Sequence, residues 1–404
     1  MLAQPLRDMV ANLTGYTTWY NWTSHSYYQV VPIEPGGVTI VSHNSAIVSK
    51  FAFGKRNVYA SVNGLNVTYL PVDEQEDATI DTIYDMASLT KIFTSVAALI
   101  QIDKGDFELN DTVASHFPRF AANGKSNVTI LQLVTHTSGF DADPSPSLAN
   151  KTAYKTYEER IVAILDTSLI NEPGSTYLYS DLNYMSLMLL LEHITGNSLD
   201  ELIYNFTSRL GMSSTFFNRG NIEGPALPFY ERMAAEEFQI AVLGPSEPAR
   251  PQPVRGTVHD ENAWALDGVS GHAGLFSTVG DTAKLCQMIL NNGTYGGVRY
   301  LKEETVGLIF TNFNTRFPGD EHGVGFELNQ YYTSGPMASL LAASHTGFTG
   351  TSMVIDRGSN TFFLHFSNRV HPSRTWSSNN IVREAVGYWV AKSLGKEIAQ
   401  SPFP

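Results

Sequence analysis

The 404-residue sequence contains a single cysteine, Cys286, so it can form neither an internal disulfide nor a cysteine-based metal cluster. Cys286 lies in the apolar stretch 283–290, which predicts a core position for it. The sequence also lacks any run of about 18 uninterrupted apolar residues, so we expect no membrane span. Its first residues, 1–7, contain no apolar segment of the kind found in a signal peptide.

Positive charge is also scarce. There are 26 Lys and Arg residues against 39 Asp and Glu residues, which gives a formal net charge of −13. No basic run compensates this charge, so the sequence argues against a nucleic-acid or anionic-membrane partner. Hydrophobic residues make up 43% of the chain, as in ordinary globular proteins. The expected partner is therefore a small-molecule or peptide substrate.

Acceptor sites for N-glycosylation are frequent. The motif Asn-x-Ser/Thr occurs eight times, at Asn12, Asn21, Asn66, Asn110, Asn127, Asn150, Asn205 and Asn292. Such a number favours a secreted glycoprotein, although loops rich in Asn and Thr would produce the same excess. A starting methionine joined to a mature chain would reconcile this prediction with the missing signal peptide.

The order of the expected elements predicts an α+β fold. Two β-rich runs, 38–42 and 46–53, surround an Asn-containing turn and predict a hairpin. Helical and loop-like sequence follows from 85 to about 270, and a second β-rich block precedes a final helix at 381–394. One antiparallel sheet flanked by helices, with a mostly helical insertion, accommodates this order. We therefore expect a sheet domain (1–84 with 275–404), a helical domain (85–274), and an active site in the cleft between them.

Ser88 and Lys91 stand at the start of a predicted helix, 88–104, whose apolar residues recur at helical spacing. Ser88 is a favourable N-cap residue type, and Lys91 lies one turn further along the same face. A buried amine loses its proton more readily, so Lys91 could accept the proton of the Ser88 hydroxyl. The alternative is a capping serine followed by a lysine that extends to solvent. Ser393-Leu394-Gly395-Lys396 fits the same spacing but opens no apolar helix.

Two later stretches have the composition that a serine nucleophile requires. Tyr179 and Asp181 lie two residues apart just before an apolar helix, so both can project into one cleft if the segment is extended. The alternative is that Asp181 caps this helix and Tyr179 is a core residue. Further on, Gly347 follows His345 and Thr346, and a glycine in a strand allows a ligand to approach the backbone closely. A plain turn with an incidental histidine is the alternative.

These three stretches, in this order, resemble the three motifs of the serine β-lactamase and penicillin-binding-protein superfamily, in particular its class C and esterase-like branch. The flanking stretches 133–140 and 271–278 are similar to the family pattern as well. The resemblance extends from about residue 36 to residue 394. It implies an antiparallel sheet with helices on both faces, a helical domain, and an active site in the cleft between them.

The resemblance also implies the role of each residue. Ser88 would attack a carbonyl, and Lys91 and Tyr179 would share the proton transfers. The backbone N–H groups of Ser88 and Phe348 would form the oxyanion hole. The substrate edge would be lined by Asp181, His345, Thr346 and Gly347. The family chemistry requires no cofactor, and the scattered histidines suggest no metal.

Two residues depart from the family pattern. Asp181 stands where the family more often has Asn, and a carboxylate beside Lys91 would favour its charged form and strengthen the case for Tyr179 as the base. His345 stands where many members have Lys. A neutral imidazole attracts a substrate carboxylate less, which counts against β-lactams and peptides ending in D-alanine. An arginine such as Arg369 or Arg374 could substitute.

The stretch 256–264, with 271–274 and 368–372, resembles the branch that contains exo-acting N-acetylmuramyl-L-alanine amidases. His259, Asp260 and Asn262 would then bind a sugar or a peptide, although a helix start capped by Asp260 explains the same pattern. The leading hypothesis is a serine amidase that cleaves the N-acetylmuramyl-L-alanine bond of muropeptides. The alternatives are a promiscuous esterase or D-amino-acid peptidase, a less favoured β-lactamase, and a catalytically silent binding module.

Overall fold

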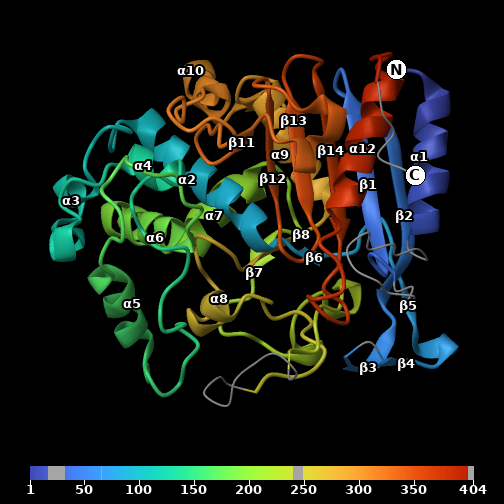
Figure 1. Cartoon of the computed structure of the whole chain (residues 1–404), viewed down its shortest axis with the longest axis horizontal. Helices are drawn as coiled ribbons and strands as arrows, with labels where there is room; N and C mark the ends of the chain where they lie inside the picture. Colours follow the sequence, from blue (N-terminus) through green and yellow to red (C-terminus); the bar gives the residue numbers. More distant parts are fainter. Residues whose placement is uncertain (17–31, 65, 240–248, 399–404) are drawn as a thin grey trace.

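The computed structural model describes residues 1–16, 32–64, 66–239 and 249–398. Its largest sheet has seven strands in the order β11-β12-β13-β14-β1-β2-β5, and the paired strands are antiparallel (Figure 1). These strands are β1 (Gly36–His43), β2 (Ala46–Asn57), β5 (Glu76–Asp77), β11 (Glu327–Leu328), β12 (Ala342–Thr346), β13 (Ser352–Asp356) and β14 (Thr361–Ser367). The predicted hairpin is confirmed as β1 and β2. Pairing of β1 with β14 joins the two ends of the chain, so the predicted α+β class with an antiparallel sheet is confirmed.

The two faces of the sheet bury different residues because successive side chains of a strand point to opposite sides. In β13, Met353 and Ile355 belong to one hydrophobic cluster, whereas Val354 belongs to another. Likewise in β14, Leu364 lies on the first side and Phe363 on the second. Both faces of the central strands are therefore covered. For this reason their sequences contain consecutive apolar residues and do not alternate between apolar and polar residues.

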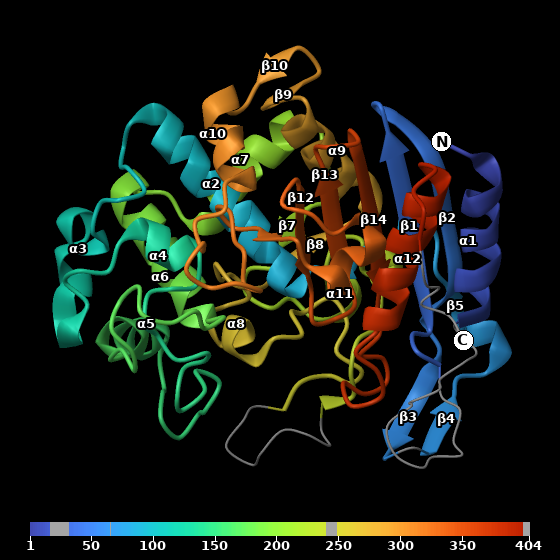
Figure 2. The same cartoon turned by 45° about the horizontal axis from the view of Figure 1, so that its top comes forward.

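Helices from both ends of the chain cover one face. α1 (Ala3–Tyr16) and α12 (Asn380–Ser393) lie side by side on the same face of the sheet in both views (Figures 1 and 2). α9 (Val279–Leu290) packs on the opposite face, against β1 and β14. Cys286 of α9 is fully buried, as predicted.

The residues between the two strand blocks form mostly helices, drawn in cyan through green to yellow in Figure 1. The predicted helices near 129–135, 157–165 and 182–195 are all present. This region contains α2 (Thr90–Lys104), α3 (Val113–His116), α4 (Ile130–Val134), α5 (Tyr157–Asp166), α6 (Asp181–Thr195), α7 (Leu199–Arg209) and α8 (Glu261–Ala265). α2 is buried on nearly every side and ends at Lys104, because Gly105 adopts a left-handed conformation (φ +83°).

A small three-stranded sheet, β6-β8-β7, links this helical region to the rest of the chain. Its strands are β6 (Tyr84–Asp85), β7 (Phe216–Phe217) and β8 (Leu275–Ser277). The expected boundaries at 84/85 and 274/275 fall within β6 and directly before β8, and the division into two domains stays a prediction. Short peripheral elements complete the described fold: β3 (Tyr59–Asn63), β4 (Asn66–Tyr69), β9 (Thr294–Tyr295), β10 (Val298–Arg299), α10 (Glu303–Gly307) and α11 (Tyr331–Ser334).

Two sequence predictions, on membrane spans and on glycosylation acceptors, can be compared with the described residues. Among the helices of the described residues, none is both long and apolar enough to cross a bilayer. Seven of the eight glycosylation acceptors lie in the described residues, and each is exposed or partly exposed. The eighth, Asn21, lies outside them.

Candidate active site

Ser88 lies in a tight turn at the start of α2. The turn is the 3-10 helix η2 (Ala87–Leu89), and Leu89 rather than Ser88 occupies the N-cap position of α2. The prediction that Ser88 caps the helix is therefore wrong, because the extra turn places it before the cap. Ala87 has φ +45°, a conformation that costs a residue with a Cβ atom about 1–3 kcal/mol. The buried Asp85 carboxylate holds this turn by accepting the Ala87 N–H at 2.8 Å.

Lys91 is fully buried and points at Ser88. Its Nζ lies 3.0 Å from the Ser88 Oγ and donates to the carbonyl oxygen of His272 at 3.2 Å. The carboxylate of Asp181 lies 2.7 Å from the same nitrogen. Lys91 is thus not an isolated buried amine, because the Asp181 carboxylate pairs with it.

Tyr179 completes the group around Ser88. Its hydroxyl shares a side-chain hydrogen bond with Ser88, and Lys91 Nζ lies 4.7 Å from the centre of its ring. Burial raises the pKa of Tyr179 well above its ordinary value, and the negative charge of Asp181 raises it further. Tyr179 is therefore a neutral phenol, a proton donor, in the resting site.

A histidine that the sequence analysis did not single out holds this segment. The ring of His136 packs against the ring of Tyr179 with centroids 4.4 Å apart, and its Nδ1 accepts the Ser180 N–H at 3.0 Å. Burial lowers the pKa of His136 well below its ordinary value, so the ring is neutral and can accept. Ser180, not Asp181, is the N-cap of α6, which frees the Asp181 carboxylate to face Lys91. The His136 stretch matched the family pattern, and that match was the available signal.

Strand β12 presents His345 and Thr346 at the edge of the site. His345 is 2% exposed, and its Nδ1 donates to the carbonyl oxygen of Thr346 at 2.8 Å. Burial lowers the pKa of His345 to about 3, so its ring is neutral. Because Nδ1 carries the proton, Nε2 is an acceptor, and no described group bonds to it.

Gly347 follows this strand where the chain passes close to the turn of Ser88. A Cβ atom at position 347 would lie 2.0 Å from Thr351 Oγ1 and 2.6 Å from the carbonyl oxygen of Met86. The expected reason for this glycine was approach of a ligand. The structure shows that the protein's own backbone requires it, because Thr351 Oγ1 also donates to Met86 O at 3.1 Å.

His259, Asp260 and Asn262 lie together at the start of α8, and each already has protein partners. The Asp260 side chain accepts the Ala263 N–H at 2.8 Å, so the helix cap considered in the sequence analysis is present. His259 Nε2 lies 2.9 Å from Glu237, which is completely buried. Asn262 Oδ1 accepts from the Leu148 N–H at 2.7 Å.

His272 connects Asp260 to the Lys91 pair. Its Nε2 lies 2.9 Å from Asp260 and 3.9 Å from Asp181. Burial opposes its charged form, but the two carboxylates hold the pKa of His272 above its ordinary value. These three side chains are near enough to share a metal ion, with candidate ligand atoms all within 4.8 Å of one another. Lys91 already neutralises Asp181 at 2.7 Å, so the chemistry is that of an ion-pair network.

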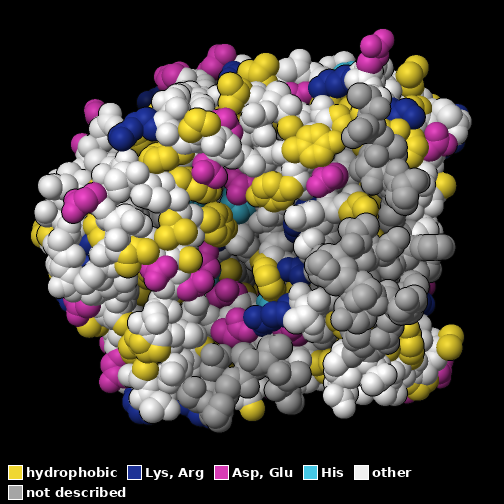
Figure 3. Space-filling view, viewed as in Figure 1, with side chains coloured by type: hydrophobic (Ala, Val, Ile, Leu, Met, Phe, Trp, Pro, Cys, Tyr) yellow, Lys and Arg dark blue, Asp and Glu magenta, His cyan; other side chains and the backbone are white. Residues whose placement is uncertain are grey.

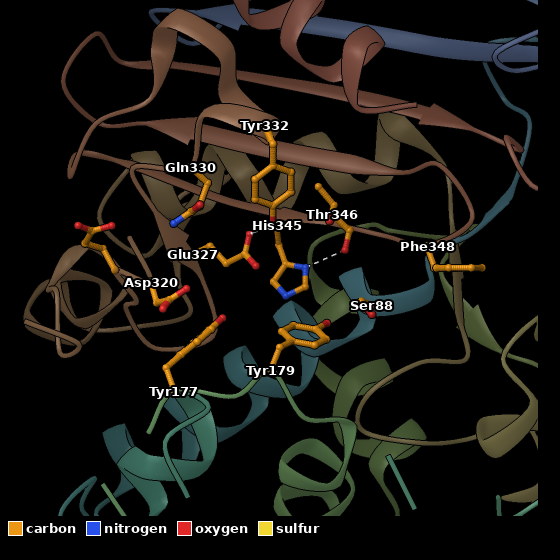
Figure 4. A pocket seen from close by; sticks show the side chains of 11 residues that line it. Ser88, Tyr177, Tyr179, Asp320, Glu327, Gln330, Tyr332, His345, Thr346 and Phe348 are labelled. Atoms are coloured by element: carbon orange, nitrogen blue, oxygen red, sulfur yellow. Dashed lines mark hydrogen bonds between the residues drawn. The ribbon is translucent and has the colours of Figure 1, made fainter. Parts of the chain in front are cut away.

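Two cavities meet at Ser88, and Ser88, Tyr179 and Phe348 line both. The face in Figure 3 is hollowed in its middle, with acidic side chains beside the hollow. We call the first the tyrosine cavity; it has a volume of about 400 Å³ and is lined by Ser88, Tyr177, Tyr179, Asp320, Glu321, Glu327, Gln330, Tyr332, His345, Thr346 and Phe348 (Figure 4). The second, the loop cavity, has a volume of about 540 Å³ and is lined by Ala87, Ser88, Asp143, Pro144, Ser147, Tyr179, Asp181, His259, Asp260, Glu261, Asn262, Ala273, Phe348 and Arg374.

The structure thus brings all the predicted site residues to one region and adds others. Tyr177, Asp320, Glu327 and Tyr332 were not predicted. Glu327 lies in β11, which is only two residues long and shows no alternation to read, and the pairing of β11 with β12 places it. Tyr177 and Asp320 lie in loops, and Tyr332 lies in the short helix α11.

Comparisons with known proteins agree with this arrangement. A family model described as Beta-lactamase matches residues 33–387. A protein of Escherichia coli (strain K12) named "Putative D-alanyl-D-alanine carboxypeptidase" is 34% identical over 356 residues, which cover 82% of this chain and 78% of the relative. A Salmonella typhimurium protein of the same name is 34% identical over 316 residues, covering 73% of this chain and 71% of the relative.

Solved structures show the same fold at low sequence identity. A penicillin-binding protein homologue from Pyrococcus abyssi has a TM-score of 0.67 at 19% identity, over 98% of this chain and 78% of that one. EstCE1, a hydrolase with promiscuous acyltransferase activity, has a TM-score of 0.68 at 18% identity, over 95% and 99%. A class C β-lactamase from Rhodobacter sphaeroides has a TM-score of 0.65 at 18% identity, over 96% and 99%.

Proposed function

Because the chain belongs to the β-lactamase family and is a serine hydrolase, we propose that it cleaves an amide bond of cell-wall fragments through an acyl-enzyme on Ser88. The family match covers the three motifs from which the resemblance was drawn. The observation that carries the proposal is the 3.0 Å contact between Lys91 Nζ and Ser88 Oγ, with Tyr179 bonded to the same hydroxyl. A serine activated in this way is a nucleophile for carbonyl carbon.

The proton can move along the contacts of Lys91. Transfer of a proton from Lys91 to Asp181, 2.7 Å away, leaves a neutral amine. That amine accepts the Ser88 proton as Oγ attacks the carbonyl, and it becomes an ammonium again. The phenol of Tyr179 then protonates the leaving group. Because Ser88 Oγ is now esterified and carries no proton, the phenolate receives a proton from the Lys91 ammonium, which lies beside its ring. Asp181 returns its proton to Lys91, so all three residues regain their resting charges.

The oxyanion of the tetrahedral intermediate would be bound by the backbone N–H groups of Ser88 and Phe348. Both residues line both cavities, so a carbonyl between them would be accessible from either side. The Phe348 segment is held in place because its carbonyl oxygen accepts from Arg369 Nε at 2.6 Å. Fixed backbone donors stabilise a developing charge without reorganising.

For the scissile bond we infer the amide between N-acetylmuramic acid and L-alanine. The loop cavity beside Ser88 is polar and large enough for a sugar or a short peptide, and it is lined by His259, Asp260 and Asn262. These residues lie in the stretch that resembles the muramyl-L-alanine amidases. Their partners within the protein fix their orientation before a substrate arrives, which reduces the entropy lost on binding.

A D-amino-acid peptidase is the second candidate, and the names of the Escherichia coli and Salmonella relatives favour it. Against a substrate with a terminal carboxylate stands the neutral His345, which offers no positive charge. The two arginines considered as substitutes are already engaged. Arg374 pairs with Glu237 and Glu261 at 2.5 Å each, and Arg369 donates to the carbonyl oxygens of Phe348, Arg374 and Ser377. The same argument counts against β-lactams, whose carboxylate would dock at the same position.

Incubation of the enzyme with digested peptidoglycan, followed by mass spectrometry, tests the proposal. Release of the stem peptide from N-acetylmuramic acid supports the amidase. Loss of a terminal alanine alone supports the peptidase and overturns the amidase. If a muramyl dipeptide and all stem peptides stay intact while short acyl esters are hydrolysed, the cell-wall substrate itself is wrong. Nitrocefin should show slow or no turnover.

We also infer that the protein is secreted and glycosylated. The support is that the seven described acceptor asparagines are accessible, as the glycosylation machinery requires. Treatment of protein from its native source with an N-glycosidase should increase its gel mobility. Unchanged mobility would contradict the inference.

A further inference from the structure

The tyrosine cavity has an unusual charge balance for a site next to a nucleophile. Three carboxylates line it, those of Asp320, Glu321 and Glu327, and its lining contains no lysine or arginine. Nearby cations exist, but they are used elsewhere. Lys91 is paired with Asp181, and Arg383 donates to the carbonyl oxygen of Gly347 at 2.7 Å, behind β12. Above pH 7, where Glu327 is ionised, a group that enters this cavity therefore meets negative charge that no cation of its lining compensates.

The polar side chains of the cavity are mainly hydrogen-bond acceptors. His345 is 2% exposed, and its unprotonated Nε2 has no partner among the described residues. Figure 4 shows its ring directed into the cavity, between the Glu327 carboxylate and the Tyr179 ring. A buried acceptor without a donor costs free energy, which a ligand bearing N–H groups would recover.

Glu327 is the deepest of the carboxylates and is 9% exposed. It accepts one hydrogen bond, from Tyr332 Oη at 2.5 Å, which leaves most of its acceptor capacity free. The amide nitrogen of Gln330 is committed to the carbonyl oxygens of Gly319 and Leu328 at 2.9 and 3.1 Å, so it is not a free donor. The walls thus provide acceptors in excess.

Aromatic rings supply the remaining surface. Tyr177, Tyr179 and Tyr332 line the cavity, and the Tyr179 and His345 rings lie 6.0 Å apart. The faces of tyrosine rings attract cations, most strongly where water is excluded. The cavity thus combines carboxylates, tyrosine ring faces and an imidazole acceptor without a described partner. An alkylammonium group complements this lining, because it carries a positive charge and up to three N–H donors.

We propose that the tyrosine cavity is a subsite for a primary ammonium group of the substrate, held by Glu327 and Asp320 with His345 Nε2 as a further acceptor. This inference rests on the proposed function, because it assumes that the substrate reacts at Ser88. It adds to that function the charge of the substrate, and it gives the His345 position a role opposite to that of a lysine. The cavity selects an amine and repels a carboxylate.

Matched substrates measure this selectivity. On the leaving-group side, N-acetylalanine 2-aminoethylamide is compared with the propylamide, in which CH₃ replaces NH₃⁺, and with N-acetylalanylalanine, which carries a carboxylate. On the acyl side, alanyl p-nitroanilide is compared with isobutyryl p-nitroanilide. Each alanine compound is used in its D and L forms. We expect a 10- to 100-fold higher kcat/KM for the ammonium member of one pair, as a charge-assisted hydrogen bond provides, and the lowest value for the carboxylate.

Two variants assign the effect to the cavity. Glu327→Gln should lower the ratio of ammonium to neutral kcat/KM by about 10-fold or more, and Asp320→Asn, at an exposed position, by about 2- to 5-fold. Since Asp320 is exposed, this second variant remains informative even if Gln at 327 disturbs folding. Glu74→Gln is the matched control. It removes the same charge from the exposed 3-10 helix η1 (Val72–Glu74), and the ratio should stay as in the wild type.

Failure of this inference differs from failure of the proposed function. Hydrolysis of every substrate with ratios near one, or preference for the carboxylate, overturns the ammonium subsite and leaves the hydrolase intact. If no substrate is turned over, binding to Ser88→Ala by calorimetry decides: tighter binding of the 2-aminoethylamide than of the propylamide supports the subsite, and equal binding overturns it.

Discussion

The two cavities that meet at Ser88 differ in how their polar groups are satisfied. In the loop cavity, His259 pairs with Glu237, Asn262 accepts from Leu148, and Arg374 binds two carboxylates. In the tyrosine cavity, His345 Nε2 has no described partner and Glu327 receives one hydrogen bond. The polar side chains of the loop cavity are already held by other protein groups, whereas those of the tyrosine cavity still have free acceptor atoms. We therefore expect the loop cavity to orient the substrate and the tyrosine cavity to discriminate between substrates by their charge.

Substitution of Ser88, which lines both cavities, should have the largest effect on activity. Ser88→Ala removes the nucleophile and should lower kcat at least about 10⁴-fold on any substrate. Ser393→Ala is a matched control, because Ser393 begins the same Ser-x-x-Lys pattern but its Oγ donates to Val390 O inside α12. Initial rates and circular dichroism of both variants provide the measurement. Residual activity of Ser88→Ala above about 1% would make another residue the nucleophile.

Gly347→Ala disturbs the residue before Phe348, which lines both cavities. The new Cβ atom would lie 2.6 Å from the Met86 carbonyl oxygen, so the strand end must move away from the turn of Ser88. We expect a loss of about 3 kcal/mol or more in the free energy of unfolding, together with a fall in activity toward substrates of either cavity. Denaturation in urea measures the first. Gly280→Ala is the control, since a Cβ atom there meets only Thr278 Oγ1, at 3.9 Å, an ordinary contact, and the substitution in α9 should stabilise the chain by about 0.5–1 kcal/mol. Equal stability of the two variants would contradict the packing argument.

Glu327→Gln tests whether the buried Glu327 carboxylate of the tyrosine cavity lowers the free energy of unfolding. Burial raises the pKa of Glu327 from 4.5 to about 7, while Tyr332, Arg383 and Lys91 act in the opposite direction and Asp320 adds to the rise. The folded chain holds a proton here between pH 4.5 and 7 that the unfolded chain has released. This contribution to stability is complete below pH 4.5 and is lost as the pH rises through 7.

The variant should therefore be more stable than the wild type at pH 8, by up to about 3 kcal/mol, with the difference disappearing near pH 4. Urea denaturation at both pH values, with Glu74→Gln alongside, measures this difference. A destabilised variant at pH 8 would mean that the carboxylate is structural.

Asp181→Asn tests the pair in the loop cavity. It leaves the fully buried Lys91 without its carboxylate, and we expect a loss of about 1–3 kcal/mol in the free energy of unfolding at pH 7. Asp143→Asn is the control in the same cavity, since Asp143 makes no ion pair with a described residue and burial raises its pKa to about 6. It should leave the stability unchanged or slightly higher. Equal effects of the two substitutions would show that the Lys91 pair contributes nothing.

The sequence predicted what depends on local pattern and on order along the chain. Hydrophobic periodicity located the hairpin and the main helices, and the ordered motifs placed Lys91 and Tyr179 beside Ser88. It failed where tertiary geometry decides. The 3-10 turn with Ala87 at φ +45° displaced Ser88 from the N-cap, because buried Asp85 and Thr351, the residue before β13, hold that turn.

The tyrosine cavity was missed for a related reason. Glu327 belongs to a two-residue strand, and Asp320 and Tyr177 come from loops that no short-range pattern connects. The departure of His345 from the family's lysine was visible in the sequence. The consequence of this departure could not be predicted from the sequence. It depends on the hydrogen bond to the carbonyl oxygen of Thr346, which fixes the tautomer of His345 and leaves Nε2 facing the cavity.

The central claim is that Ser88 forms a covalent acyl-enzyme, activated by Lys91 and Tyr179. Its most direct test is acid-quenched reaction with a slow acyl ester or a fluorophosphonate, followed by peptide mapping by mass spectrometry. We expect one adduct, on the peptide that contains Ser88, which disappears in Ser88→Ala and forms much more slowly in Lys91→Ala. An adduct at another residue, or hydrolysis with no adduct at Ser88, would contradict the account.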